Sequence, residues 1–343
     1  MGNAFTAVAD DTSAFFFNPA GLARRKDHEL KMSIGAGMDT KVIDFYHDIK
    51  DAESKNGDQN KMDAIVNLLE NNYGNYYSIR APTVGAFFAW PRWEIAFIPA
   101  DLSVDMNVHQ CVGPCLNVNG YLDSTLAASF GREVHWAKGH QISWGTTVKA
   151  VHRVYAGQLL LAADLVKGSE IFQASDAREG LTFDLDYGMM WTPPIRIAKW
   201  FKPTFAVVAR NLIDYGFKQN FHVVDPNSGE PPSLGRRLDF GSNWNMPDIW
   251  VFHPHIAIDE RDIGDPNFTP RKGFHAGMEL FWTMYSWWQG HWSFGYNQGY
   301  LSGGVGAKFT WFQFDFATYG EDVGTPAMPQ QSRRYLAEIA LDF

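Results

Sequence analysis

The chain has 343 residues, of which 20% are charged, and its formal net charge is -9. Because no basic stripe offsets this acidic balance, we expect no nucleic-acid partner. No stretch approaches the uninterrupted run of about 18 apolar residues that a transmembrane helix requires, which excludes a helical membrane protein, whereas 13 tryptophans and 31 glycines are typical of barrels and propellers.

The chain opens with an apolar segment that contains a kink. Residues 14–25 read AFFFNPAGLARR, with adjacent phenylalanines directly before an Asn-Pro pair. Proline disfavours helical geometry in the residue before it and lacks the donor that would continue a ladder. We therefore predict that residues 1–27 form an apolar hatch or plug. Its gate is predicted to consist of Phe15, Phe16, Phe17, Asn18, Pro19 and Ala20.

From Glu29 onward, apolar and polar residues alternate with a period of two. Such alternation indicates half-buried strands and not helices. Counting the alternating segments gives about fourteen strands, an even number that suits a closed bacterial barrel. The strands are predicted at 29–38, 80–90, 93–108, 116–131, 140–155, 180–192, 203–213, 236–245, 249–259, 272–282, 289–297, 303–311, 312–319 and 334–343.

Two observations favour a transmembrane barrel over a soluble sandwich, which the alternation alone would also fit. The connections are mostly long on one side and short on the other, which is the outer-membrane pattern. Tryptophans, whose indole rings prefer a membrane interface, gather beside the short turns. They are Trp90, Trp93, Trp136, Trp191, Trp200, Trp244, Trp250, Trp282, Trp287, Trp288 and Trp311. We predict an all-β, closed antiparallel transmembrane barrel over residues 28–343, with long extracellular loops, in the bacterial outer membrane.

Two long loops show helical spacing of apolar residues. The first is KMDAIVNLLENNYGNYY, residues 61–77, which predicts a helical stretch near 60–73. The second is GQLLLAADLVKG, residues 157–168. These helices either shelter the mouth of an apolar ligand site or only cap the barrel. The opening MGNAFTAVADD lacks the features of a signal peptide, so we expect a mature or trimmed chain if the protein is exported.

The only two cysteines, Cys111 and Cys115, flank a Gly-Pro turn. In an oxidising compartment they would close a small disulfide loop, whereas two cysteines alone make a poor metal site.

Pro99 interrupts the third predicted strand, where it cannot donate to a neighbour, so we predict a kink in the wall through which an apolar ligand could leave sideways. The alternative is a harmless strand end and a permanent plug.

The strand alternation also predicts which charged residues face the lumen. Both signs occur, so a paired network is favoured over an ion path of one sign. The inward set is Asp101, Asp105, Lys149, Arg153, Asp184, Asp186, Arg210, Arg237, Asp239, Asp259, Glu279, Lys308, Asp315 and Glu338. Signals for catalysis or metal binding are weak, even in the Asp184–Asp186 pair and in His253, His255 and His275. We expect no enzyme activity, no metal and no cofactor.

The opening GNAFTAVADDTSAFFFNPAGLAR resembles the N-terminal hatch of the long-chain fatty-acid transporter (FadL/TodX-like) family of outer-membrane β-barrels. The terminal strand RRYLAEIALDF, which ends in Phe343, resembles the signal that the barrel assembly machinery reads. The family resemblance implies a plugged lumen in a Gram-negative outer membrane and the binding or passage of fatty-acid- or lipid-like molecules. The alternatives are a structural or secretion-associated plugged barrel and a hydrophilic general porin. The many outward aromatic residues also favour self-association into a homo-oligomer.

Overall fold

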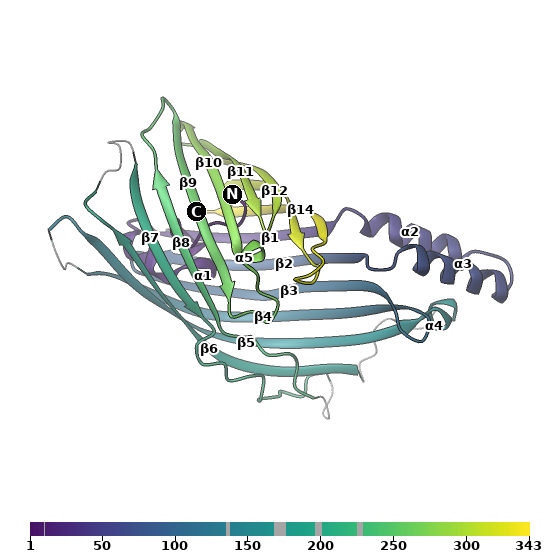
Figure 1. Ribbon diagram of the computed structural model, residues 1–343. Helices are drawn as coiled ribbons and strands as arrows, with labels where there is room; N and C mark the ends of the chain where they lie inside the picture. Colours follow the sequence, from purple (N-terminus) through teal and green to yellow (C-terminus); the bar gives the residue numbers. More distant parts are fainter. Residues whose placement is uncertain (10, 135–137, 168–175, 196–200, 225–228) are drawn as a thin grey trace.

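The computed structural model describes residues 1–343 apart from 10, 135–137, 168–175, 196–200 and 225–228. Its described residues form fourteen strands, each paired with its neighbours in the chain, and the pairing of β1 with β14 closes the sheet (Figure 1). Every pairing is antiparallel. The predicted fold class, a closed antiparallel barrel, is therefore confirmed.

The strands are β1 (Glu29–Asp39), β2 (Tyr76–Trp90), β3 (Trp93–Gln110), β4 (Pro114–Val134), β5 (Gln141–Leu161), β6 (Ala177–Thr192), β7 (Lys202–Arg210), β8 (Arg237–Asn245), β9 (Phe252–Ile263), β10 (Phe274–Tyr285), β11 (Trp288–Asn297), β12 (Tyr300–Phe309), β13 (Phe312–Asp322) and β14 (Gln331–Asp342). The helices are α1 (Ala14–Phe17), the 3-10 helix η1 (Pro19–Arg24), α2 (Val42–Glu53), α3 (Asp58–Asn71), α4 (Ala162–Val166) and α5 (Pro270–Gly273). None of the described helices is long and apolar enough to cross a membrane.

The alternation in sequence becomes an apolar outer wall. In β1, Met32, Ile34 and Met38 are exposed on the outside, whereas Lys31 and Ser33 point the other way. Successive side chains of a strand point to opposite faces of its sheet, so one face of each strand meets the lumen. Large apolar side chains exposed on the outer wall are normal in lipid but would be an aggregation hazard in water.

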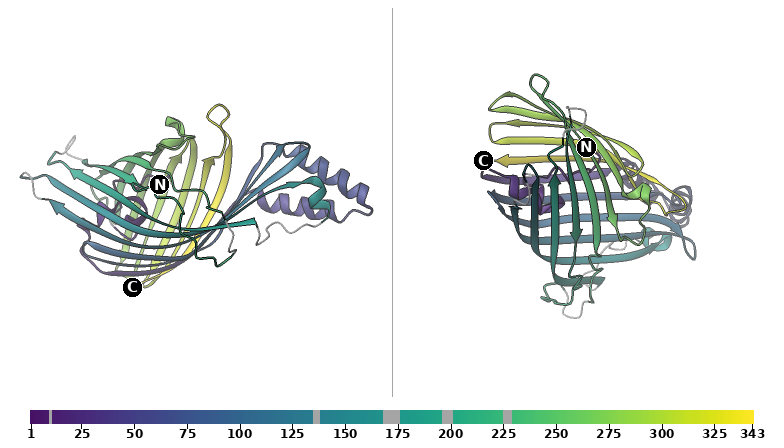
Figure 2. Two further views of the ribbon diagram at one scale, coloured as in Figure 1. Left: turned by 90° about the horizontal axis from the view of Figure 1, so that it is seen from below. Right: turned by 60° about the vertical axis from the view of Figure 1, so that its left-hand side comes forward.

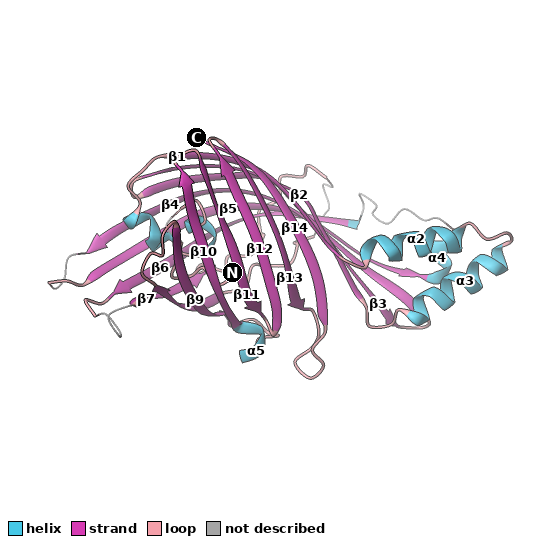
Figure 3. Cartoon of the chain, turned by 90° about the horizontal axis from the view of Figure 1, so that it is seen from above, coloured by secondary structure: helices cyan, strands magenta, loops and turns pink. Residues whose placement is uncertain are grey.

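Strands β2 to β5 continue beyond the rest of the barrel at the long-loop end (Figures 1 and 3). Helices α2, α3 and α4 pack against one face of this extension. Their shared core consists of Val42, Phe45, Ala52, Ile65, Leu69, Tyr77, Val108, Leu116, Val118, Leu160, Ala162 and Leu165. The helices therefore cover an apolar surface that the extended strands would otherwise expose.

The second predicted helix was largely wrong. Residues 157–161 belong to β5, and of the residues that the structure describes in this stretch only Ala162–Val166 are helical. The reason is that β4 runs alongside and pairs with this stretch from Asn119↔Gly157 to Cys115↔Leu161. A partner strand supplies hydrogen bonds that override a marginal helical preference.

Tryptophans project from the wall around the short-turn end of the barrel. Trp93, Trp191, Trp287 and Trp311 are 42 to 52% exposed, and Trp250 is 83% exposed. Trp282 is buried instead and meets Trp288 edge to face. Trp136 and Trp200 lie outside the described residues. The described part thus presents half-exposed indoles at one end of the apolar wall, an arrangement suited to an interface.

Candidate functional site

The N-terminal segment, residues 1–24 apart from residue 10, lies against the inner wall of the barrel (Figures 1 and 2). Polar contacts hold its first turn to β9 and β10. The backbone N–H of Thr6 donates to Asp259 (2.8 Å), and Arg261 donates to the carbonyl of Asn3 (3.0 Å). The ring nitrogen Nδ1 of His275 lies 2.9 Å from the carbonyl oxygen of Gly2. We call residues 1–24, apart from residue 10, the lumen segment.

Glycines in the wall make room for the lumen segment. A Cβ at Gly145 of β5 would lie 2.3 Å from the backbone of Pro19, and one at Gly188 of β6 would lie 2.1 Å from Asn18 Oδ1. Gly131 of β4 faces the backbone of Ala23 in the same way, at 2.7 Å. Side chains larger than hydrogen do not fit at these distances, so three neighbouring strands share one glycine-lined seat for η1.

Asn18 ties two parts of the lumen segment together. Its side chain is fully buried, donates to the carbonyl of Thr6 (2.8 Å) and accepts from the N–H of Ala20 (3.0 Å). The second bond caps η1, in which Pro19 occupies the first turn, where its missing N–H costs nothing. The predicted motif Asn18, Pro19 and Ala20 is thus the turn that seats η1 against the wall.

The three predicted gate phenylalanines have different surroundings. Phe15 is buried in a cluster with Phe87 and Ile98 of the wall. Phe16 is 45% exposed, and its ring contacts those of Phe15 and Phe87. Phe17 lies on the other side of α1, where its ring centroid is 5.3 Å from that of Phe5 and the Arg261 guanidinium lies 4.8 Å from its centre.

Pro99 lies at an irregularity of the wall. The β3–β4 register shifts between Ile98 and Asp101, and the β2–β3 register shifts between Arg80 and Thr83 and again between Val84 and Ala86. Ser124 of β4 donates its hydroxyl to the carbonyl of Pro99 (2.7 Å). Strands that shift register bend and lose ladder bonds locally.

An ion pair bridges this irregularity. Arg80 stands just before the shift in β2, Asp101 just after the shift in β3, and Arg80 Nε donates to Asp101 Oδ1 at 2.8 Å. Phe15 of the lumen segment belongs to the same buried cluster as Ile98, so the segment meets the wall close to the residue that interrupts the strand.

Many charged side chains in the lumen are paired, in agreement with the mixed signs in the sequence. Lys149 lies 2.7 Å from Asp186, and Arg153 lies 2.7 Å from Asp123. Further pairs are Arg210–Asp239, Arg237–Asp265, Lys31–Glu338, Lys308–Asp342 and Arg334–Glu321. Pairing offsets the cost of removing these charges from water.

Cavities lie on both sides of the lumen segment. The upper cavity, toward the long loops, has a volume of about 530 Å³, and Phe5, Phe17, Arg80 and Leu336 are among its lining residues. Two lower cavities, toward the short turns, have volumes of about 490 and 530 Å³. Phe5 lines all three cavities, a position that the sequence analysis did not single out.

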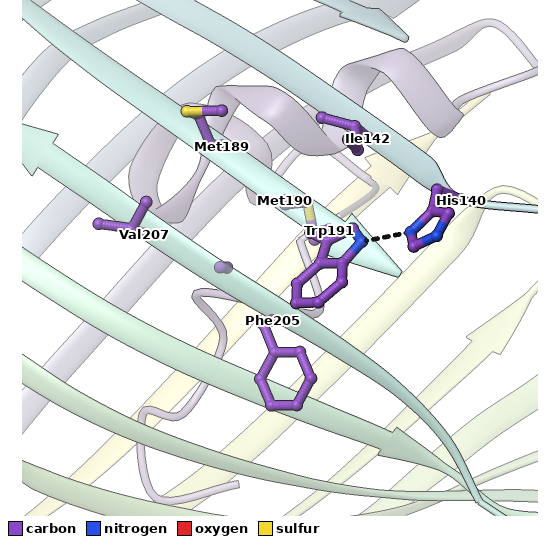
Figure 4. A pocket seen from close by; sticks show the side chains of 8 residues that line it. His140, Ile142, Met189, Met190, Trp191, Phe205 and Val207 are labelled. Atoms are coloured by element: carbon purple, nitrogen blue, oxygen red, sulfur yellow. Dashed lines mark hydrogen bonds between the residues drawn. The ribbon is translucent and has the colours of Figure 1, made fainter. Parts of the chain in front are cut away.

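A further apolar groove of about 640 Å³ lies on the wall where β6 meets β7 (Figure 4). Met189, Trp191, Phe205 and Val207 line it, and Trp191 Nε1 donates to His140 Nδ1 at 3.1 Å. Since Met189, Trp191 and Phe205 are exposed side chains of the outer wall, the groove belongs to the surface and not to the lumen.

A disulfide links Cys111 and Cys115 in the β3–β4 hairpin. Together with His109 they form the one group in the described residues with the spacing of a metal site, but the disulfide takes both thiols.

The weak catalytic candidates are dispersed among structural contacts. Asp184 and Asp186 accept backbone N–H groups of Ile213 and Asn211, His253 pairs with Asp248, and His255 faces Glu279 at 3.4 Å.

No family model matches the chain, and no curated protein is significantly similar to it. Among solved structures, the toluene transporter TbuX from Ralstonia pickettii has a TM-score of 0.46 at 11% identity, over 100% of this chain and 98% of that one. A FadL homologue from Pseudomonas aeruginosa has a TM-score of 0.43 at 8% identity, over 99% and 95%. CdiB from Acinetobacter baumannii has a TM-score of 0.37 at 8% identity over 93% of this chain, which spans only 60% of that protein. Barrels of the FadL and TodX type are thus among the similar structures, and the likeness concerns the fold alone.

Proposed function

We propose that this protein is an integral barrel of a Gram-negative outer membrane that binds hydrophobic molecules and passes them across that membrane. The observation that carries the proposal is the contact between the lumen segment and the irregular wall. Phe15 lies in one buried cluster with Ile98, which precedes Pro99, where the registers of β2, β3 and β4 shift. An apolar segment that contacts a lipid-facing wall beside a break in its hydrogen-bond ladder is better suited to act as a gate than as a permanent plug.

The route begins in the upper cavity. Arg80 lines this cavity and also borders the register shift, so the cavity reaches the wall at the irregularity. Phe5, Phe17 and Leu336 give the cavity apolar surface. In our proposal, a hydrophobic molecule enters from the long-loop end, displaces Phe15 from its cluster on the wall and leaves sideways at Pro99.

The porin alternative fits less well, because the lumen segment occupies part of the interior that a general porin keeps open. A barrel linked to secretion, with a permanent plug, is the outcome if the side route does not exist. The proposal assigns no enzyme activity. It also includes self-association and recognition of the terminal strand by the barrel assembly machinery, for which Phe343 is available because it is 63% exposed.

The test is uptake of a fluorescent fatty-acid analogue into vesicles that contain the purified protein. Pro99→Val supplies the missing donor and should regularise the ladder, so uptake should fall to the level of protein-free vesicles. Pro203→Val in β7 changes a strand proline far from the irregularity and is the matched control. Unchanged uptake in folded Pro99→Val, or an equal loss in both variants, would refute the side route. Wild-type uptake no faster than lipid alone would refute transport altogether.

A further inference from the structure

The upper cavity shares one lining residue, Phe5, with each of the lower cavities. The two lower cavities also share Asp11, Glu279 and Phe281, so they adjoin each other beneath the ring. A phenyl ring takes more space than the share of about 30 Å³ that one water molecule occupies in the liquid. Removing this ring would therefore leave room for water between cavities that are already large enough to hold it.

The backbone around Phe5 fixes the ring in place. The carbonyl of Phe5 accepts from the N–H groups of Val8 and Ala9 (both 3.1 Å), which closes a turn. The next residue, Thr6, is held from both sides by Asp259 and Asn18. Phe5 itself packs against Met1, Ala4 and Ala257. A ring on so constrained a backbone can act as a fixed partition.

Two carboxylates, those of Asp11 and Glu279, line both lower cavities. Among the described residues, no lysine or arginine lies within ion-pair distance of Asp11 or Glu279, and the ion-pair contacts of Glu279 are to His255 (3.4 Å) and His291 (3.9 Å). An imidazole is a full cation only when it is protonated. Of the basic residues that line the lower cavities, Arg25 pairs with Glu29, Lys31 with Glu338 and Lys308 with Asp342, and Arg24 donates to the hydroxyl of Thr192. Carboxylates at a constriction that have no lysine or arginine partner attract cations and repel anions.

We propose that Phe5 is the barrier of a straight passage through the lumen, separate from the side route at Pro99, and that this passage takes uncharged or cationic solutes and rejects carboxylates. The two routes serve different chemistry. The side route suits apolar molecules, because it leads from the upper cavity, which the rings of Phe5 and Phe17 line, into lipid. The straight route passes polar and charged groups below Phe5, and Asp11 and Glu279 line both lower cavities there.

The test is the conductance of the full-length protein in planar bilayers under a potassium chloride gradient. Phe5→Ala should raise the conductance several-fold, and its reversal potential should shift toward that of potassium. Phe16→Ala is the matched control, because it removes the same ring from the same segment but that ring lines none of the three cavities. Adding Glu279→Gln to Phe5→Ala should reduce the preference for cations and leave the conductance high.

A second variant covers the case in which Phe5→Ala folds poorly. Phe5→Cys introduces a unique thiol, since the native cysteines form a disulfide and the described chain has no free cysteine. Its raised conductance should fall when a benzyl methanethiosulfonate restores a ring at this position. An unchanged conductance in folded Phe5→Ala or Phe5→Cys, an equal rise in Phe16→Ala, or an anion-selective current would each overturn the proposal. These readouts do not depend on fatty-acid uptake, so they stand apart from the proposed function.

Discussion

The glycine-lined seat makes the position of the lumen segment testable by one added methyl group. At Gly145, a Cβ would lie 2.3 Å from the carbonyl carbon of Pro19 and 2.5 Å from the backbone nitrogen of Ala20. Optimal separations between non-bonded heavy atoms are about 3.5 to 4.0 Å, so Gly145→Ala must displace η1 by roughly 1 Å or more. Both contacts are with backbone, which cannot rotate away. Overpacking of this kind costs about 1–3 kcal/mol.

Two measurements report the displacement. The free energy of unfolding in urea, followed by tryptophan fluorescence in reconstituted vesicles, should fall by about 1–3 kcal/mol for Gly145→Ala. Trypsin cleavage after Arg24 should become faster, because Arg24 now donates to Thr192 (2.8 Å) and lies partly buried against the wall. Gly35→Ala is the matched control, since its Cβ would meet nothing closer than 3.5 Å.

The control distinguishes a collision with η1 from the general effect of replacing a strand glycine by alanine. Gly35 is also an inward glycine of a strand, so its replacement by alanine changes the same backbone entropy without a collision. If Gly145→Ala unfolds and is cleaved like the wild type, or if Gly35→Ala is equally affected, η1 does not sit against β5 as described. The contact distances would then be irrelevant to stability in the membrane.

Two further predictions concern the outside of the barrel. Brominated lipids should quench tryptophan fluorescence most strongly at one depth, because the described indoles gather at the short-turn end, and quenching spread evenly across the bilayer would contradict a girdle. The proteolytic fragment that contains Cys111 and Cys115 should gain the mass of two hydrogens on reduction, and two alkylated thiols in unreduced native protein would show that the loop is open.

Much of the fold could be predicted from the sequence because a strand that separates lipid from lumen must alternate. That requirement acts on every second residue, so it is visible without knowledge of any partner. The length of the β3–β4 hairpin was harder to predict from the sequence. Residues 109–115 were expected to be a loop, but β3 continues to Gln110 and β4 begins at Pro114. Their length reflects packing against α2 to α4, which a local pattern does not contain.

The candidate site could be predicted only in part. The Asn-Pro-Ala turn was visible because proline and a capping side chain leave a local mark in the sequence. Phe5 left no such mark. It is one of 26 phenylalanines, and its position between cavities follows from Asp259 holding Thr6, which is 253 residues away in the chain. The glycine seat was equally hidden, because each of its glycines lies on a different strand and only the closed barrel brings them together.

Both proposed routes involve the lumen segment, and a hydrogen bond of Asn18 couples the two halves of this segment. Phe15 stands at the wall irregularity and Phe5 at the lumenal partition, and the bond from Asn18 to the Thr6 carbonyl joins the two halves of the segment. If the turn at Asn18 moves with Phe15 while Phe5 stays in place, this buried bond breaks, and an orphaned buried group costs about 1–3 kcal/mol. Moving both together keeps the bond but opens the lumen to ions. A side gate that does not leak ions therefore requires the lumen segment to change conformation at Asn18, while the bond between Thr6 and Asp259 of β9 stays intact.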